Sequence, residues 1–221
     1  MKTPQAHTCP DHMVVTAPTL AAGIDWVAQK LGVAPRIGGE HIKLGTHNAL
    51  LRLGPQFYLE VIAINPAAPP LSPPRARWFG LDRIKADDAP RLAHWVARTD
   101  DIHAASAASP IATGLIEEMS RGPLHWLISI AADGSLPMAG LMPSLIQWQA
   151  EPHPAQALPE LGCSLHTLEI RHPQAVEIHR ALQAIGLQQS DPVAQAISIV
   201  PDLRIGLHAQ ILTAGGLRTL D

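Results

Sequence analysis

The stretch GTHNALLRLGPQFYLEVIAINP, from Gly45 to Pro66, decides how the rest of the chain is interpreted. The runs from Asn48 to Leu53 and from Phe57 to Ile64 are typical of strands, and Gly54-Pro55-Gln56 between them is typical of a turn. The stretch therefore predicts a β-hairpin. Glu60 lies inside the second strand among apolar neighbours, where a charge is costly unless something pairs with it or coordinates it.

Outward from the hairpin, the sequence predicts a strand at His12 to Thr16, a helix at Leu20 to Leu31 and a strand near Arg36. The first part of the chain then has the element order βαβββ. Two later parts repeat this order, and their first strands begin at His94 and His166 in the same register. The repetition predicts an α+β fold built from tandem βαβββ modules.

Two proline-rich stretches, at residues 65–74 and 149–162, mark joints because proline is excluded from helix interiors and central strands. We expect a first module over residues 1–65, a connector over residues 66–90, a second module over residues 91–150 and a third module-like segment over residues 163–221. In the third, residues 193–200 are predicted as a strand. The third segment either caps the first two modules or pairs with another chain, and we favour a homodimer.

The composition favours a small-molecule partner. The 221 residues carry a net charge of -3 and no dense cluster of Lys and Arg, which argues against nucleic acid or an anionic membrane as the main partner. No apolar stretch has the length of a signal peptide core or a membrane helix. Cys9 and Cys163 lie in no metal-binding spacing and are expected to be free thiols. We expect a cytoplasmic protein.

Strand alternation brings four polar residues to one face of the predicted sheets: His12, Glu60, His94 and Gln147. Two imidazoles, a carboxylate and an amide oxygen suit a divalent ion such as Zn, Ni, Co, Mn or Fe. A lone strand histidine is more often structural, and Gln147 alone indicates little. The matched placement in two modules favours the metal. Trp95 and Trp148 are expected in the core under the helices, and the other histidines, including His41 and His153, are expected to be structural or exposed.

Five segments carry a resemblance to a known family: DHMVV from Asp11, GGEHIKLGTHNALLRLG from Gly38, YLEVIAINP from Tyr58, RWFGL from Arg77 and SLIQWQAEPHPA from Ser144. Together they resemble the glyoxalase-like branch of the vicinal oxygen chelate superfamily. The resemblance implies that paired modules curl into a partly open, mixed-sheet half barrel with helices outside.

The resemblance also implies roles for particular residues. His12 and Glu60 would hold the metal, and Thr46, His47 and Asn48 would line or shape the same cavity. Glyoxalase I looks to use His or Gln, Glu, His and Glu as ligands, and the position that matches its fourth ligand here is Gln147. The second half of the site therefore departs from the family pattern.

We expect a metal-dependent lyase or isomerase that acts on a small carbonyl compound or a 2-oxo or 2-hydroxy acid through a stabilised enolate. Glu60 is the expected general base. The expected substrate-binding residues are His47, Asn48, Tyr58 and Arg121. A metal-free protein that sequesters a ligand between aromatic and apolar walls is the alternative, and an Fe(II) ring-cleaving dioxygenase is the third candidate.

Overall fold

The computed structural model describes residues 6–149 and 152–221 of the chain, so residues 150 and 151 of the second predicted joint lie outside the described part. The first module has the predicted order βαβββ. Its elements are β1 (Thr8–Thr16), α1 (Leu20–Leu31), β2 (Arg36–His41), the short 3-10 helix η1 (Ile42–Leu44), β3 (Thr46–Gly54) and β4 (Phe57–Ile64).

Helix α1 spans the predicted residues because its ends are capped. The Thr19 hydroxyl accepts a hydrogen bond from the backbone N–H of Ala22, which satisfies a donor of the first turn. Gly32 ends the helix with a left-handed φ of 73°, a conformation that glycine adopts without strain. Leu20, Val27 and Leu31 are buried against the sheet.

The second module repeats the order with η2 (Trp78–Arg83) before it. Its elements are β5 (Arg91–Thr99), α2 (Ile102–Ala108), β6 (Leu115–Arg121), β7 (Leu124–Ile130), η3 (Pro137–Gly140) and β8 (Ser144–Trp148). The two modules share one eight-stranded sheet of order β2-β3-β4-β1-β5-β8-β7-β6. In each module the first strand pairs parallel with the last, and β1 pairs antiparallel with β5 where the modules meet.

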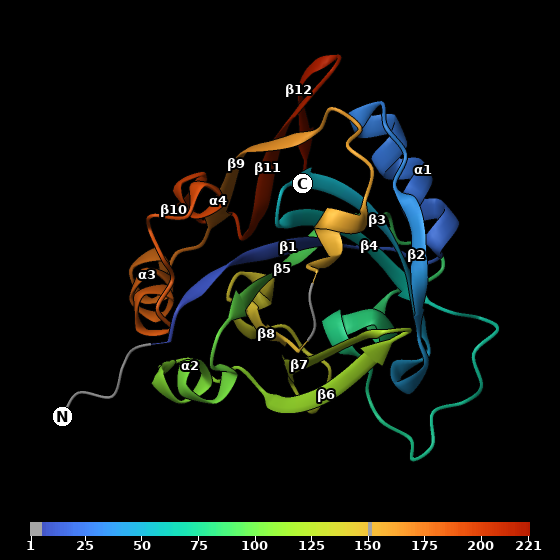
Figure 1. Ribbon diagram of the computed structural model, residues 1–221, viewed down its shortest axis with the longest axis horizontal. Coiled ribbons are helices and arrows are strands. Elements are labelled where there is room, and N and C mark those ends of the chain that lie inside the picture. The colour runs from blue at the N-terminus through green and yellow to red at the C-terminus, as the bar shows by residue number, and fades with distance from the viewer. Residues whose placement is uncertain (1–5, 150–151) are drawn as a thin grey trace.

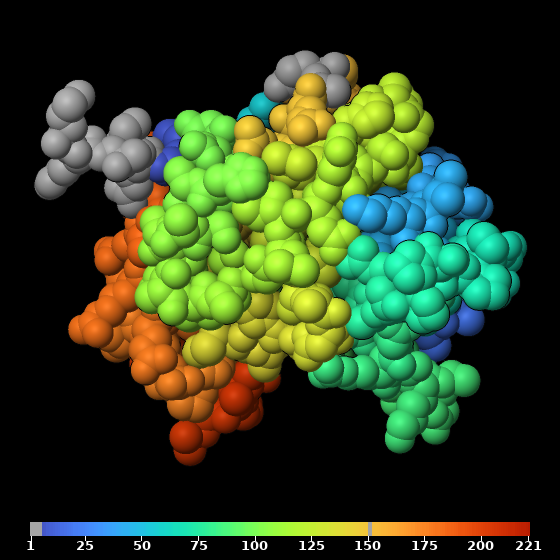
Figure 2. Space-filling model, turned by 90° about the horizontal axis from the view of Figure 1, so that it is seen from below, coloured from blue at the N-terminus to red at the C-terminus, as the bar shows by residue number. Residues whose placement is uncertain are grey.

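The eight-stranded sheet curls so that its edge strands β2 and β6 come into contact. The ammonium of Lys43 lies 3.0 Å from the carboxylate of Glu117 and donates to the backbone oxygen of Glu118. Arg75 in the proline-rich connector also pairs with Glu117. Figure 2 shows the light-blue residues of β2 and the teal connector beside the yellow-green β6–β7 hairpin. The predicted half barrel is confirmed.

The third module forms a separate sheet of order β10-β9-β11-β12. Its elements are η4 (Pro154–Ala157) in the joint before it, then β9 (Ser164–Arg171), α3 (Ala175–Ala184), α4 (Pro192–Gln195), β10 (Ile197–Val200), β11 (Gly206–Thr213) and β12 (Gly216–Leu220). Residues 193–195 were predicted as strand, but they are helical because the Asp191 carboxylate accepts hydrogen bonds from the N–H groups of Val193 and Ala194. In the described residues, no helix has the length and apolar character to span a membrane.

The third module covers the convex face of the half barrel, as Figure 1 shows for the orange and red strands β9, β11 and β12. Leu168 and Ile170 of β9 share one core with Met13 of β1 and Trp95 of β5. Of the two arrangements left open by the sequence, the chain therefore shows the one in which the third module caps the first two.

The concave face has its own core, which includes Val14 of β1, Ile62 of β4 and Val96 of β5. Trp78 and Phe79 of η2 also belong to it, so the connector fills part of the barrel interior. The predicted alternation along β1, β4 and β5 is confirmed, because Met13, Leu59 and Trp95 lie in the convex core. His12, Glu60 and His94 therefore share the concave face.

Candidate active site

A cavity of about 330 Å³, its open mouth included, lies on the concave face. Five of its eleven lining residues are aromatic, namely Tyr58, Trp78, Phe79, Trp126 and Trp148, and its charged and imidazole groups come from His12, His41, Glu60 and Arg121.

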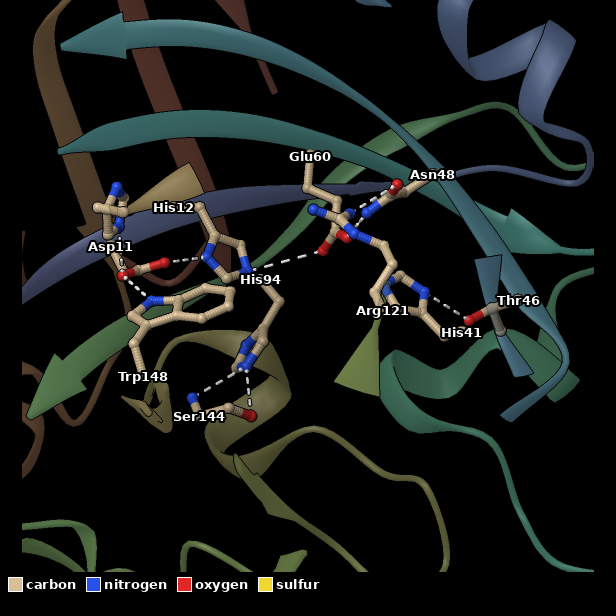
Figure 3. A network of polar contacts seen from close by, with 11 residues as sticks. Asp11, His12, His41, Thr46, Asn48, Glu60, His94, Arg121, Ser144 and Trp148 are labelled. Atoms are coloured by element: carbon tan, nitrogen blue, oxygen red, sulfur yellow. Dashed lines mark hydrogen bonds and ion pairs between the residues drawn. The ribbon is translucent and has the colours of Figure 1, made fainter. Parts of the chain in front are cut away.

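Glu60 projects into this cavity from the middle of β4 and is only 6% exposed. The side-chain amide of Asn48, on the neighbouring strand β3, donates to Glu60 Oε1 at 2.6 Å (Figure 3). Asn48 Oδ1 accepts from the backbone N–H of Gly39 at 2.9 Å and from Arg121 Nη1 at 3.1 Å. These donors fix the orientation of the amide. Asn48 is therefore the inward-facing residue of β3.

His47 takes the opposite face of β3 and does not line the cavity, so the expectation that it binds substrate there is wrong. Its Nε2 has no hydrogen-bond partner in the described part of the chain. Partial burial lowers its pKa below the ordinary value of 6.5. Thr46, two residues before Asn48 on β3, shares the concave face with it and contacts the cavity residue His41, whose Nδ1 lies 3.1 Å from the Thr46 hydroxyl.

Asp11, the residue before His12, contacts the ring nitrogen of His12 that faces away from Glu60. His12 Nδ1 lies 2.6 Å from Asp11 Oδ1, although neighbouring residues of a strand normally face opposite sides. A register shift between Pro10 and His12 in the β1–β5 pairing explains the contact, because a bulge re-aims the side chain at the extra position. Trp148 Nε1 and His153 Nε2 each lie 2.9 Å from Asp11 Oδ2.

Asp11 is fully buried yet ionised. Burial by itself would raise the pKa of this carboxyl, but the hydrogen bonds from His12 and His153 hold the pKa well below its ordinary value of 3.8. A carboxylate only accepts hydrogen bonds, so His12 must carry its proton on Nδ1. His12 Nε2 then faces Glu60 Oε2 at 3.6 Å, beyond the usual length of a hydrogen bond.

Tyr58 supports the His12 ring from one side. The two rings stack with centroids 4.6 Å apart and planes inclined by 16°. Burial, and then the negative charges of Asp11 and Glu60, raise the pKa of Tyr58 well above 10.0, so its phenol keeps its proton. Tyr58 lines the cavity, as expected of a substrate-binding residue.

Arg121 brings a positive charge to the cavity from the end of β6. Among the described residues it forms no ion pair, whereas Arg75 on the same side of the barrel pairs with Glu117 and holds the pKa of that carboxyl at about 2. Burial, and then the charge of Arg121, lower the pKa of His41 to about 3, so the His41 ring is neutral. The cavity therefore contains a cation with which no carboxylate of residues 6–149 or 152–221 forms an ion pair.

His94 lies on the predicted face but does not join Glu60. Val14 of β1 is opposite Glu60 on one side and His94 on the other, so the width of β1 separates them. Both His94 nitrogens are engaged: Nδ1 lies 2.9 Å from the Gly140 oxygen, and Nε2 accepts from the Ser144 N–H at 3.1 Å. Burial lowers the pKa of His94 to about 4. The Phe79 ring, 5.4 Å away, packs over it.

Gln147 was predicted on the cavity face, and this is wrong. Because Ser144 bonds to His94 on the concave side, alternation along β8 brings Ile146 and Trp148 to the cavity and Gln147 to the opposite face. There Gln147 Oε1 accepts from the N–H of Ile102 at 2.9 Å, in the first turn of α2. The expectation that Trp148 lies under the helices is corrected by the same alternation, whereas Trp95 does lie in the convex core.

These side chains do not fit the predicted metal. His12 Nε2 and Glu60 Oε2 are two potential donors, but His94 and Gln147 are engaged elsewhere, and protein-held centres use at least three ligands. Within the described ranges, no three His, Cys, Asp or Glu side chains form a group that could hold a metal. Arg121, hydrogen-bonded to Asn48, adds a fixed positive charge beside the two donors.

Sequence reasoning missed Asp11, His41 and His153 as parts of the site. An acid next to His12 within a strand-like run was a usable signal for Asp11, because a buried charge needs partners. His153 gave no comparable signal, since it lies in the proline-rich joint far along the chain.

The glyoxalase-like domain family matches residues 11–186. No curated protein sequence matches the chain. A hypothetical protein from Staphylococcus aureus, 12% identical, superposes with a TM-score of 0.55 over 97% of this chain and 85% of that chain, which shows a shared fold. A methylmalonyl-CoA epimerase aligns with a TM-score of 0.43 and 14% identity, over 68% of this chain and 100% of that one. A mutant 4-hydroxymandelate synthase from Streptomyces coelicolor aligns with a TM-score of 0.47 and 13% identity, over 99% of this chain and 63% of that one. With its matched residues spanning both modules of the half barrel, this chain belongs to the glyoxalase-like domain family.

Proposed function

We propose that this protein is an isomerase or lyase that moves a proton at the carbon next to a carbonyl group of a small anionic substrate. The observation that carries the proposal is the polar cluster of Asp11, His12, Asn48, Glu60 and Arg121 at an aromatic cavity, with Glu60 Oε2 and His12 Nε2 facing each other at 3.6 Å. Such a pair can take up a proton on one group and deliver a proton from the other.

Arg121 is the group that binds the anion in this proposal. A guanidinium without an ion-pair partner in a mostly apolar cavity favours a carboxylate, which it can bind through two parallel hydrogen bonds. The aromatic walls accommodate the apolar part of a flat ligand and exclude water around it. These features support a 2-oxo acid, a 2-hydroxy acid or a related carbonyl compound as the substrate class.

Glu60 is the proposed base. The bond between the substrate carbon and its hydrogen breaks, the proton passes to Glu60 Oε2, and the electron pair remains on the substrate as an enolate. Arg121 stabilises the enolate charge. Glu60 then passes this proton across the gap to His12 Nε2, and the imidazolium delivers it from Nε2 to another carbon or to the oxygen, depending on the substrate, so that Glu60 is again a carboxylate and His12 is again neutral with its proton on Nδ1. No step requires a metal bound by His94 or Gln147.

Proton exchange with solvent tests the proposal. A panel of 2-oxo acids, 2-hydroxy acids and small aldehydes is incubated with the protein in deuterated water, and loss of the α-proton signal is followed by NMR. We expect at least one compound to exchange, and Glu60→Gln to slow that exchange by roughly 100-fold or more. The exposed acid Glu118 lies on β6, the strand that carries Arg121, but does not line the cavity, and it provides the matched control because Glu118→Gln should leave the rate unchanged. Exchange that persists in Glu60→Gln would contradict the proposal, as would a panel in which no compound exchanges.

A metal-free binding protein is the second candidate, and the indoles of Trp78, Trp126 and Trp148 favour it. Such a protein would bind a flat apolar ligand through stacking and burial. Quenching of tryptophan fluorescence by a panel of aromatic compounds discriminates the two functions. Tight binding that Glu60→Gln leaves unchanged, without proton exchange, favours sequestration over catalysis.

A further inference from the structure

We propose that His153 is a positioning residue for the site: through Asp11, it fixes the tautomer of His12 and thereby leaves His12 Nε2 facing Glu60. This inference rests on the proposed function, which assigns His12 a role in proton transfer. His153 lies outside both modules that build the cavity, in the joint that leads to the third module.

The His153 ring has one possible arrangement of its proton. Its Nδ1 accepts a hydrogen bond from the backbone N–H of Ala155 at 3.2 Å, so the ring proton lies on Nε2. Nε2 then donates to Asp11 Oδ2 at 2.9 Å. Pro152 and Pro154 flank the residue and restrict its backbone, and the His153 oxygen accepts from the N–H of Gln156. These contacts fix the position of the His153 Nε2–H group independently of its hydrogen bond to Asp11.

Asp11 transmits this constraint to His12. Asp11 Oδ2 accepts hydrogen bonds from His153 and Trp148. These bonds fix the plane of the carboxylate and direct Oδ1 at His12 Nδ1. Asp11 is 0% exposed and His153 is 4% exposed, so water cannot replace a lost donor without a local rearrangement. An ionised Asp11 requires the proton of His12 on Nδ1.

A proton relay is the competing role for His153, and the geometry argues against it. A relay would have to take up a proton at Nδ1 and release another from Nε2. Nδ1 already accepts the Ala155 N–H, so this route is closed unless the 3-10 turn at its side opens. His153→Gln separates the two roles, because an amide side chain can position Asp11 but cannot relay a proton.

The experiment reads the tautomer of His12 directly. The ring nitrogens and protons of the histidines are observed by 15N–1H NMR, with His12→Gln used for assignment. In the wild type we expect a protonated, hydrogen-bonded Nδ1 with a downfield, slowly exchanging proton. His153→Phe should weaken this signal and increase the population of the alternative His12 tautomer by about tenfold. His153→Gln should preserve the Nδ1 signal, because the amide N–H of its side chain can reach Asp11.

Two further variants keep the result interpretable. Trp148→Phe removes the other donor to the same oxygen and should shift the His12 signals in the same direction, even if His153→Phe does not fold. His172 also accepts a backbone N–H two residues on, from Gln174, but does not contact Asp11, so His172→Phe should leave His12 unchanged.

The inference is overturned if His12 carries its neutral proton on Nε2 in the wild type. It is also overturned if both His153→Phe and Trp148→Phe leave the Nδ1 proton unaltered. Where a substrate is found, exchange should fall about tenfold in His153→Phe and recover in His153→Gln; loss in both variants would favour the relay instead. The tautomer measurement needs no turnover, so absence of proton exchange contradicts the proposed function alone.

Discussion

Asn48→Asp is the sharpest test of how the Glu60 carboxylate is held. The substitution keeps the size of the side chain and the oxygen that accepts from Gly39 and Arg121, but it replaces the amide that donates to Glu60 with a second carboxylate oxygen. A lost hydrogen bond to a charged group costs about 1.5–3 kcal/mol. Two like charges about 4 Å apart repel by about 4 kcal/mol at an effective dielectric constant of about 20.

Attraction between the new carboxylate and Arg121 offsets part of this cost, so we expect the free energy of unfolding to fall by about 3 kcal/mol at pH 7. Urea unfolding followed by circular dichroism measures the change. Adding Glu60→Gln in the same chain should restore most of the loss, because the amide introduced at position 60 can donate to the carboxylate introduced at position 48. Asn65→Asp is the control, since the Asn65 oxygen accepts from the Ala67 N–H and keeps that acceptor.

The reasoning about Asn48 fails if the single variant is as stable as the wild type to within about 0.5 kcal/mol, a difference typical of surface substitutions. It also fails if the double variant is no more stable than the single one. Either result would mean that the Asn48 amide is not the donor that orients the Glu60 side chain in the cavity.

Three other predictions concern the surroundings of the site. Gly39→Ala would bring a Cβ within 2.8 Å of Arg121 Cδ, so the guanidinium must move, and we expect the affinity for any carboxylate ligand found by the exchange screen to fall several-fold in calorimetry. Gln147→Ala leaves the N–H of Ile102 without its partner, which should lower the free energy of unfolding by about 1–2 kcal/mol while leaving the exchange rate unchanged. The pKa of Glu117 is lowered from 4.5 to about 2 by Arg75, so its ion pair stabilises the fold above pH 4.5, and this contribution is lost as the pH falls through about 2. Because Glu117 is partly solvated, Glu117→Gln should cost only about 1 kcal/mol at pH 7, and the difference from wild type in urea unfolding should shrink between pH 4.5 and 2.

Local sequence patterns were sufficient for most of the elements. The α1 boundaries follow from the Thr19 and Gly32 caps and from the spacing of apolar residues, and these signals act within a few residues of one another. The β3–β4 hairpin and the repeated βαβββ order follow from alternation and turn residues in the same way. The segment at residues 193–195 was misassigned because its β-branched and apolar residues resemble a strand, whereas the Asp191 cap makes it a helix turn.

The candidate site was only partly predictable. Alternation correctly grouped His12, Glu60 and His94 on one face, because side chains on a strand have a period of two. Alternation alone does not determine which face of a strand is concave when the loops on either side of the strand are irregular. Gln147 was assigned to the wrong face of β8 for this reason. The bulge at Asp11 depends on pairing with β5, about 85 residues further on, so local sequence carries little trace of it.

By itself, the sequence determined the modules, their repetition, the buried acid Glu60 and the histidine that faces it, since these depend on the period of a strand and on the cost of burying a charge. Only the tertiary structure decided that His94 is tied to Gly140 and Ser144, that Arg121 reaches Asn48 and that His153 meets Asp11. Each of these contacts joins residues 46 or more positions apart, and their geometry depends on how the two modules curl and how the joint folds back. The local pattern therefore predicted a set of metal ligands, whereas long-range packing assembles a cluster of carboxylates, imidazoles and one guanidinium.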